Sequence, residues 1–176
     1  MTNLPIDTFK LPVMLTALRL PSFQKHWQEV AEQADKEAWP AARFLAVLAE
    51  YEMAEWETRR IQRHFNESKL LGGKTLATYQ FEAMPSLPKA HIEALAGGDW
   101  IERGGNLIAI GNSGTGKTHI LCAIGHALIE AGYRVLYCRT GDLVQKLQVA
   151  RQELALENAL AKLDKFDLII LDDITY

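Results

Sequence analysis

The stretch that decides the fold is LIAIGNSGTGKTHI, Leu107–Ile120. Its centre, GNSGTGKT (Gly111–Thr118), fits the pattern G-x-x-x-x-G-K-[ST] at every fixed position. A short apolar run, Leu107–Gly111, precedes the glycines, and an amphipathic pattern follows from about residue 117 to residue 131. These flanks predict a strand, a loop and a helix. They disfavour the alternative, a glycine-rich turn in which the lysine occurs by chance.

Each residue type in this loop suits a polyphosphate ligand. Gly111, Gly114 and Gly116 allow the backbone to curl and direct its N–H groups inward, and the start of the following helix adds positive potential. Lys117 can approach the β- and γ-phosphates, and the hydroxyl of Thr118 can bind Mg²⁺. The motif predicts nucleotide triphosphate binding and leaves the base and hydrolysis open. The predicted binding residues are Gly111, Asn112, Ser113, Gly114, Thr115, Gly116, Lys117 and Thr118.

A second motif is FDLIILDDITY, Phe166–Tyr176, in which an apolar run leads into two carboxylates. Ligands bind at the C-terminal ends of parallel strands, so Asp172 is predicted to share a Mg²⁺ ion with Thr118. Asp173 is predicted to polarise an attacking water as a general base. A surface turn that contains two aspartates is the alternative, but a phosphate loop upstream favours the site. The predicted catalytic residues are therefore Lys117, Asp172 and Asp173.

The rest of the chain divides into a helical part and a strand–helix part. Apolar residues at spacings of three and four predict helices over Phe23–Ala38 and Ala41–Leu70, the second ended by Gly72-Gly73. From Asn106 onward, short apolar strands alternate with helices, which predicts a parallel sheet. The predicted fold class is α/β after an all-α N-terminal domain. The predicted divisions are a helical domain (1–73), a linker with a short helix (74–105) and a phosphate-loop core (106–176).

Composition excludes several classes of protein. Hydrophobic residues make up 48% of the 176 residues, which is enough for a sizeable core, and the net charge of -3 excludes a generally cationic nucleic-acid binder. Cys122 and Cys138 form no CxxC pair and are expected to be free thiols in a reducing compartment. The N-terminus does not resemble a secretory signal, and no apolar stretch is long enough for a bilayer. We therefore expect a cytoplasmic protein without a membrane partner.

Several longer stretches resemble AAA+ ATPases, and within that class the IstB family of insertion-sequence helper proteins and the related DnaC-type helicase loaders. The resemblance covers nearly the whole chain, and its upstream part favours IstB. The stretches that carry it are DWIERGGNLIAIGNSGTGKTHI (Asp99–Ile120), AGYRVLYCRTGDLVQKL (Ala131–Leu147), KFDLIILDDITY (Lys165–Tyr176), EWETRRIQRHFNESKL (Glu55–Leu70) and KTLATYQFE (Lys74–Glu82).

The resemblance implies a P-loop AAA+ sheet and the cofactors ATP and Mg²⁺. It also implies that the protein is a helper of a transposase and acts in DNA transposition. The helper itself is expected to bind double-stranded DNA without sequence preference, as an ATP-dependent homo-oligomer. A helicase loader and a truncated non-catalytic product are the alternatives. In the family a further strand lies between the phosphate-loop strand and the Walker B strand, and the sensor and arginine-finger motifs follow Walker B. The sheet is therefore expected to be incomplete at the C-terminus.

One departure from the family pattern concerns the acidic pair. AAA+ proteins usually carry Asp-Glu where this chain has Asp172-Asp173. The second side chain is one methylene shorter, so slow or partner-dependent hydrolysis is expected.

A local basic stretch is the candidate DNA contact. Phosphate contacts dominate nonspecific DNA affinity, and basic side chains cluster near the end of the second long helix. Acidic residues precede them, so an alternative is a solvated helix with internal ion pairs such as Glu55–Arg59. The tentative DNA residues are Arg59, Arg60, Arg63 and Lys69.

Overall fold

The computed structural model describes residues 8–84 and 87–174, and the chain forms two compact units, Met1–Arg60 and Ile61–Tyr176. Each unit is described by itself. The predicted divisions at residues 73/74 and 105/106 stay predictions. Two parts of the sequence analysis lie outside the described residues. They are the N-terminal residues 1–7, which do not resemble a secretory signal, and Tyr176 at the end of the second motif. None of the helices within those described ranges is long and apolar enough to cross a membrane.

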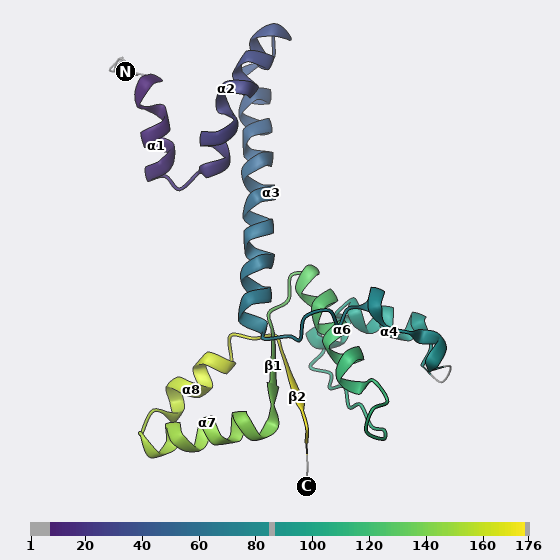
Figure 1. Cartoon of the computed structure of the whole chain (residues 1–176). Helices are drawn as coiled ribbons and strands as arrows, with labels where there is room; N and C mark the ends of the chain where they lie inside the picture. The colour runs from purple at the N-terminus through teal and green to yellow at the C-terminus, as the bar shows by residue number, and fades with distance from the viewer. Residues whose placement is uncertain (1–7, 85–86, 175–176) are drawn as a thin grey trace. The chain divides into compact units, whose positions relative to one another are not determined.

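The first unit is helical, as its sequence pattern predicts (Figure 1). Pro21 occupies the first turn of its helix, where the missing N–H costs nothing. Trp39-Pro40 separates the two long helices. The elements are η1 (Thr8–Lys10), α1 (Leu11–Ala17), α2 (Pro21–Lys36) and the first part of α3 (Ala41–Ser68), and the buried apolar residues are Leu15, Val30, Ala34 and Leu48.

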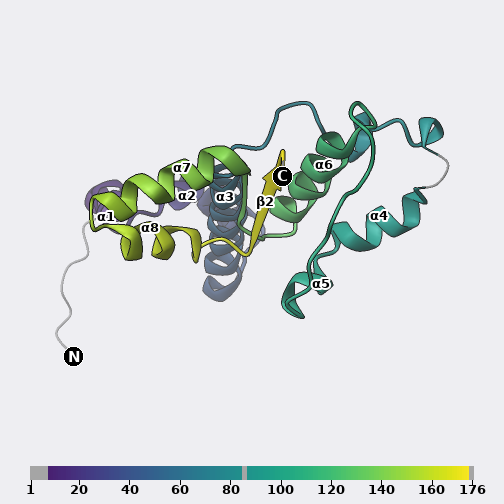
Figure 2. The ribbon, with the colours of Figure 1, turned by 90° about the horizontal axis from the view of Figure 1, so that it is seen from below.

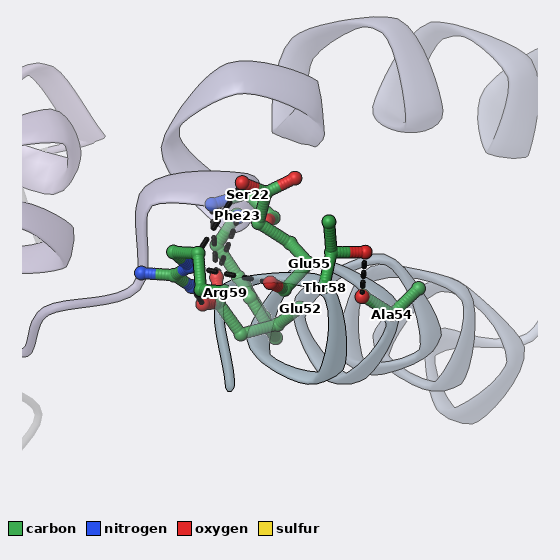
Figure 3. A network of polar contacts seen from close by, with 7 residues as sticks. All are labelled: Ser22, Phe23, Glu52, Ala54, Glu55, Thr58 and Arg59. Carbon is green, nitrogen blue, oxygen red and sulfur yellow. Dashed lines mark hydrogen bonds and ion pairs between the residues drawn. The ribbon is translucent and has the colours of Figure 1, made fainter. Parts of the chain in front are cut away.

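The N-terminus of α2 is capped by a side chain from α3. Leu20 holds the N-cap position and makes no side-chain cap hydrogen bond. Instead, Glu52 Oε2 accepts the N–H groups of Ser22 at 2.8 Å and Phe23 at 3.4 Å (Figure 3). Its other oxygen accepts the guanidinium of Arg59 at 2.9 Å. A carboxylate that satisfies orphan N–H groups at a helix start is favoured by both hydrogen bonding and the helix dipole.

Glu52→Ala is expected to loosen α2. Loss of a capping acceptor costs about 0.5–2 kcal/mol, and it leaves part-buried donors without a partner. We expect faster amide hydrogen exchange across residues 21–36, measured by mass spectrometry. Glu55→Ala is the matched control, because it removes only the exposed contact of Glu55 with Arg59 at 3.8 Å. Equal exchange in the two variants would show that Glu52 does not hold the helix start.

Helix α3 differs from its prediction in two respects. The spacing of three and four places Tyr51, Ala54 and Thr58 on the apolar face of the predicted helix, but all three are exposed. The apolar face is therefore not continuous, and the helix contributes separately to the two units. Thr58 instead donates to the carbonyl of Ala54 at 2.9 Å. The helix also ends before the predicted Gly72-Gly73 cap. The left-handed residue is Lys69 (φ 56°), directly after Ser68.

The second unit contains the two strands of the described residues and the helices around them (Figure 2). The alternation of strand and helix confirms the predicted α/β class. Its elements are the end of α3, η2 (Leu76–Thr78), η3 (Phe81–Ala83), α4 (Lys89–Ala96), α5 (Asp99–Glu102), α6 (Lys117–Glu130), β1 (Val135–Arg139), α7 (Thr140–Gln152), α8 (Leu156–Leu163) and β2 (Leu168–Asp172).

Strands β1 and β2 pair in parallel, with Val135 opposite Leu168 and Arg139 opposite Asp172. Figure 1 shows α6 on one side of this pair and α7 with α8 on the other, and in Figure 2 β2 again lies between α6 and these two helices. The side of α6 that meets the sheet is fully buried at Cys122, Leu128 and Ile129. This packing fixes the N-terminal end of α6 relative to the C-terminal end of β2, and those two ends carry the predicted site.

The predicted strand over Leu107–Gly111 is wrong. This segment makes no ladder with β1 or β2 in the described residues, and Ile108 and Ile110 are 77% and 92% exposed. An extended apolar segment becomes a strand only when a neighbour supplies its hydrogen bonds. β1 pairs with β2, and neither strand supplies hydrogen bonds to this segment.

Gly98 is required at its position. Its φ is 89°, and a Cβ there would overlap the ring of Tyr133. A left-handed conformation costs an L-residue about 1–2 kcal/mol, so Gly98→Ala is expected to lower the free energy of unfolding in urea by at least that amount. Gly141→Ala is the control, since apart from its chain neighbours and the backbone of its own helix no atom lies within 4 Å of its Cβ position. A Gly98→Ala protein as stable as wild type would contradict this geometry.

Candidate nucleotide site

A cavity of about 660 Å³ lies where the glycine loop, the start of α6 and the end of β2 meet. It brings together residues from both sequence motifs, which are separated by more than fifty positions along the chain. Of the predicted residues, those that line it are Ser113, Gly114, Gly116, Lys117, Thr118, Asp172 and Asp173. The other predicted loop residues, Gly111, Asn112 and Thr115, belong to the same turn.

The loop curls around the ammonium of Lys117. Its Nζ donates to the carbonyl oxygens of Gly111 and Asn112, each at 2.8 Å. Gly114 and Gly116 have φ values of 80° and 84°, which lets the chain reverse and enter α6 directly. The first N–H groups of a helix have no intrahelical partner, so the start of α6 presents donors and positive potential beside a fixed cation. This combination suits a polyphosphate.

The carboxylate of Asp172 connects three elements. Its Oδ2 accepts the hydroxyl of Thr118 from α6 at 2.9 Å and the hydroxyl of Tyr137 from β1 at 2.7 Å. Its Oδ1 accepts the N–H of Asp173 at 3.1 Å. The hydroxyl of Thr140, at the start of α7, donates to the backbone carbonyl of Asp172 at 2.9 Å. The end of β2 is therefore held from both neighbouring helices and from β1.

These contacts keep Asp172 ionised. Burial raises the pKa of its carboxyl, but the hydrogen bonds from Tyr137, Thr118 and the backbone of Asp173, together with the charge of Lys74, outweigh burial, and the net pKa is lowered. Because the folded-state pKa lies below the unfolded one, this contribution to stability is present at neutral pH and is lost as the pH falls through the folded-state pKa.

The oxygen donors fit Mg²⁺. Asp172 and Thr118 offer hard oxygen atoms next to the loop that would hold the phosphates. In the part of the chain that the structure describes, no three His, Cys, Asp or Glu side chains converge on a metal site. Mg²⁺ typically uses one or two protein oxygens together with substrate phosphates rather than a full protein cage. Thr118 and Asp172 are the residues that would hold it.

Asp173 lies at the edge of the same cavity and differs from Asp172 in its environment. It is exposed, has a φ of 54°, and its Oδ2 lies 3.9 Å from Nε of Arg139. The carboxylate thus remains accessible to a water molecule in the cavity. Its assignment as the general base stays a prediction.

Lys74 also lines this cavity, and the sequence patterns do not reveal it. It follows the Gly72-Gly73 turn, carries no motif, and lies near enough to lower the pKa of Asp172 by its charge. Lys74→Gln is expected to weaken ATP binding about fivefold, since one charge pair in a solvated site contributes about 1 kcal/mol. Lys74→Arg should restore most of the affinity in the same fluorescence titration. Unchanged affinity in Lys74→Gln would remove Lys74 from the site.

The tentative DNA residues are not equivalent. In the first unit, Arg59 pairs with Glu52 and Glu55, and Arg60 pairs with Glu57. The Glu55–Arg59 pair expected for a solvated helix is thereby confirmed. In the second unit, Arg63 and Lys69 are exposed, and Lys69 borders an apolar cavity between α7 and α8. Arg59 and Arg60 are paired with carboxylates of their own helix, and Arg63 and Lys69 are the more available pair.

These features define a P-loop nucleotide-binding protein of the α/β class. They are the glycine loop that leads into α6, Lys117 bound to that loop, and a parallel strand that ends in Asp172 beside Thr118. Residues 13–176 match the family described as IstB-like ATP binding protein. The chain belongs to this IstB-like ATP-binding family, within the AAA+ class of P-loop proteins.

Three relatives illustrate the similarity. An insertion-sequence ATP-binding protein of Sinorhizobium fredii is 56% identical over 97% of this chain and 58% of its own length. An IS21 ATP-binding protein of Pseudomonas aeruginosa is 32% identical over 95% of this chain and 63% of its own length. An IS5376 ATP-binding protein of Geobacillus stearothermophilus is 35% identical over 90% of this chain and 63% of its own length. The chain thus spans about three fifths of the length of these relatives.

Proposed function

We propose that this chain binds ATP together with Mg²⁺ in the cavity between the phosphate loop and β2. The observation that carries the proposal is the contact of Thr118 with Asp172, which joins the two motifs beside Lys117. In this arrangement the loop and Lys117 bind the phosphates, and Thr118 and Asp172 orient the cation. Mg²⁺, when bound, supplies charge neutralisation at the phosphate oxygens. Asp173 is the candidate group to accept a proton from water.

The wider role that we propose is that of a cytoplasmic helper of the transposase of the same mobile element. The relatives are named for insertion sequences and for ATP binding, which supports this assignment. ATP would drive homo-oligomer formation on double-stranded DNA. Arg63 and Lys69 are the proposed phosphate contacts, because Arg59 and Arg60 already have carboxylate partners.

DNA binding is tested by fluorescence anisotropy with two labelled duplexes of unrelated sequence, with and without ATP and Mg²⁺. We expect similar affinities for both duplexes, tighter binding with ATP, and a loss of affinity as salt rises. Light scattering on the same samples reports the oligomer. A protein that binds ATP but neither duplex at low salt would contradict the DNA role and leave the nucleotide site intact.

The two candidate cations are tested in the same assay. The double variant Arg63→Ala/Lys69→Ala is expected to weaken binding to both duplexes. The slope of log affinity against log salt concentration should fall by about two, the amount expected for two lost phosphate contacts. Lys36→Ala with Lys165→Ala removes the same charge from other exposed positions. Equal losses in the two double variants would show that net charge, and not this pair, determines affinity.

A further inference from the structure

Tyr137 is a buried hydroxyl donor directed at the proposed metal ligand. The residue is 8% exposed and belongs to the apolar core of the second unit. Its hydroxyl donates to Oδ2 of Asp172 at 2.7 Å, the shortest of the three hydrogen bonds to that carboxylate. The residue does not itself line the cavity, so any effect on a bound cation must pass through Asp172.

The register of the sheet explains the contact. Tyr137 is opposite Ile170, which lies two residues before Asp172 on β2. Residues two apart on a strand share a face, so Tyr137 and Asp172 are diagonal neighbours on the same face of the sheet. A diagonal separation of about 7–8 Å between backbone positions is within reach of an aromatic side chain. The core holds the ring, and the pairing of β1 with β2 places the hydroxyl level with the carboxylate of Asp172.

The two hydroxyl donors make the two carboxylate oxygens different. Tyr137 and Thr118 both donate to Oδ2, whereas among the residues that the structure describes Oδ1 accepts one hydrogen bond, from the backbone N–H of Asp173. A carboxylate oxygen has about two good acceptor positions, so Oδ2 is occupied and Oδ1 retains free capacity. The donors also fix the rotation of the carboxylate about its own bond.

We infer that Tyr137 is a positioning residue that holds Asp172 so that Oδ1 faces Mg²⁺, directly or through a bound water. The inference rests on the proposed function of the cavity as an ATP and Mg²⁺ site. Supporting groups that orient metal ligands commonly change metal affinity without touching the metal. The role predicts an effect on Mg²⁺ dependence that is separate from any effect on folding.

Tyr137→Phe removes the hydroxyl and keeps the ring. ATP affinity is measured by fluorescence titration in EDTA and over a series of Mg²⁺ concentrations. A net hydrogen bond of about 0.5–1.5 kcal/mol corresponds to a change of roughly 2- to 12-fold. We expect the Mg²⁺ concentration for half-maximal enhancement of ATP binding to rise by that factor, and the affinity in EDTA to stay the same.

Tyr133→Phe is the matched control. It removes another tyrosine hydroxyl that donates to a carboxylate, that of Glu102 at 3.2 Å, and neither residue lines the cavity. It should leave the Mg²⁺ dependence unchanged. Addition of Tyr137→Phe to an Asp172→Asn protein should also produce no further fall in the ATP affinity measured at a fixed Mg²⁺ concentration, because two residues that act through one interaction are not additive.

Three results would overturn the inference. Tyr137→Phe could show the Mg²⁺ dependence of wild type, or it could lose equal affinity with and without Mg²⁺, which would indicate only a structural role. It could also add its full effect to Asp172→Asn. If wild type itself bound no ATP, the proposed function would fail and the positioning role with it. If wild type binds ATP with Mg²⁺ and only the Tyr137→Phe prediction fails, the role of Tyr137 is wrong and the proposed nucleotide site stands.

Discussion

Lys117→Ala is expected to weaken ATP binding by about 100-fold or more. The ammonium is the cation enclosed by the loop, and hydrogen bonds to charged groups contribute about 1.5–3 kcal/mol each, or roughly 10- to 150-fold in affinity. It also holds the loop through the carbonyls of Gly111 and Asn112. The substitution therefore removes a phosphate contact and the group around which the loop is folded. Calorimetric titration with ATP and Mg²⁺ measures the loss.

The control for this experiment is Lys165→Ala. Lys165 is exposed between α8 and β2, outside the cavity, so its removal changes the net charge equally without touching the loop. Its affinity for ATP should equal that of wild type. If Lys117→Ala bound ATP as tightly as Lys165→Ala, the phosphate-loop assignment would be wrong.

Asp172→Asn is expected to remove the enhancement of ATP binding by Mg²⁺. Asparagine keeps the size of the side chain but replaces one carboxylate oxygen and the negative charge, and Mg²⁺ strongly favours charged oxygen ligands. In EDTA the variant should bind ATP at least as tightly as wild type, since a negative charge beside the phosphates is gone. We expect the affinity with Mg²⁺ to fall by about 10- to 100-fold or more, because the loss of a group that only supports a metal ligand already costs that much.

Asp173→Asn tests whether the two aspartates have different roles. Its carboxylate is exposed near Arg139 and makes no hydrogen bond to Thr118 or Tyr137, the two hydroxyl donors to Asp172. ATP affinity should therefore retain its Mg²⁺ dependence in this variant. Loss of Mg²⁺ dependence in Asp173→Asn and its retention in Asp172→Asn would reverse the roles assigned to the pair.

Local motifs predict how the centre of the candidate site is built. The glycines, Lys117 and Thr118 follow one another in sequence, and their geometry depends mainly on a tight turn into a helix. Helix α6 begins at Lys117, as predicted, and β2 delivers Asp172 at its C-terminal end. Both features depend on short-range patterns: an apolar run, the glycines and the helical period.

Features that depend on distant partners were not predictable. The segment Leu107–Gly111 has the composition of a strand, but composition does not specify which segment supplies its hydrogen bonds. Glu52 looks like one of several acidic residues on a solvated helix, yet it caps α2 because the turn at Trp39-Pro40 folds α3 back along α2. The helix end at Ser68 is set by Lys69 in a left-handed conformation, which sequence rules assign to glycine.

Tyr137 shows the same limit inside the site. In the sequence it is one of two tyrosines in an apolar run, and a core role is the natural interpretation. Its proposed role depends on the register that places it opposite Ile170, and no local pattern contains that register. The signal that could have identified Tyr137 is its hydroxyl group, a polar group in a buried strand that pairs with the strand that carries Asp172.

The most direct test of the account is a calorimetric titration of the folded wild-type chain with ATP, in EDTA and in Mg²⁺. The account predicts one nucleotide per chain, with affinity enhanced by Mg²⁺. Circular dichroism on the same sample establishes that the helices are formed. A helical, folded chain that binds no ATP at millimolar concentration, with or without Mg²⁺, would contradict the central claim that this cavity is a nucleotide site.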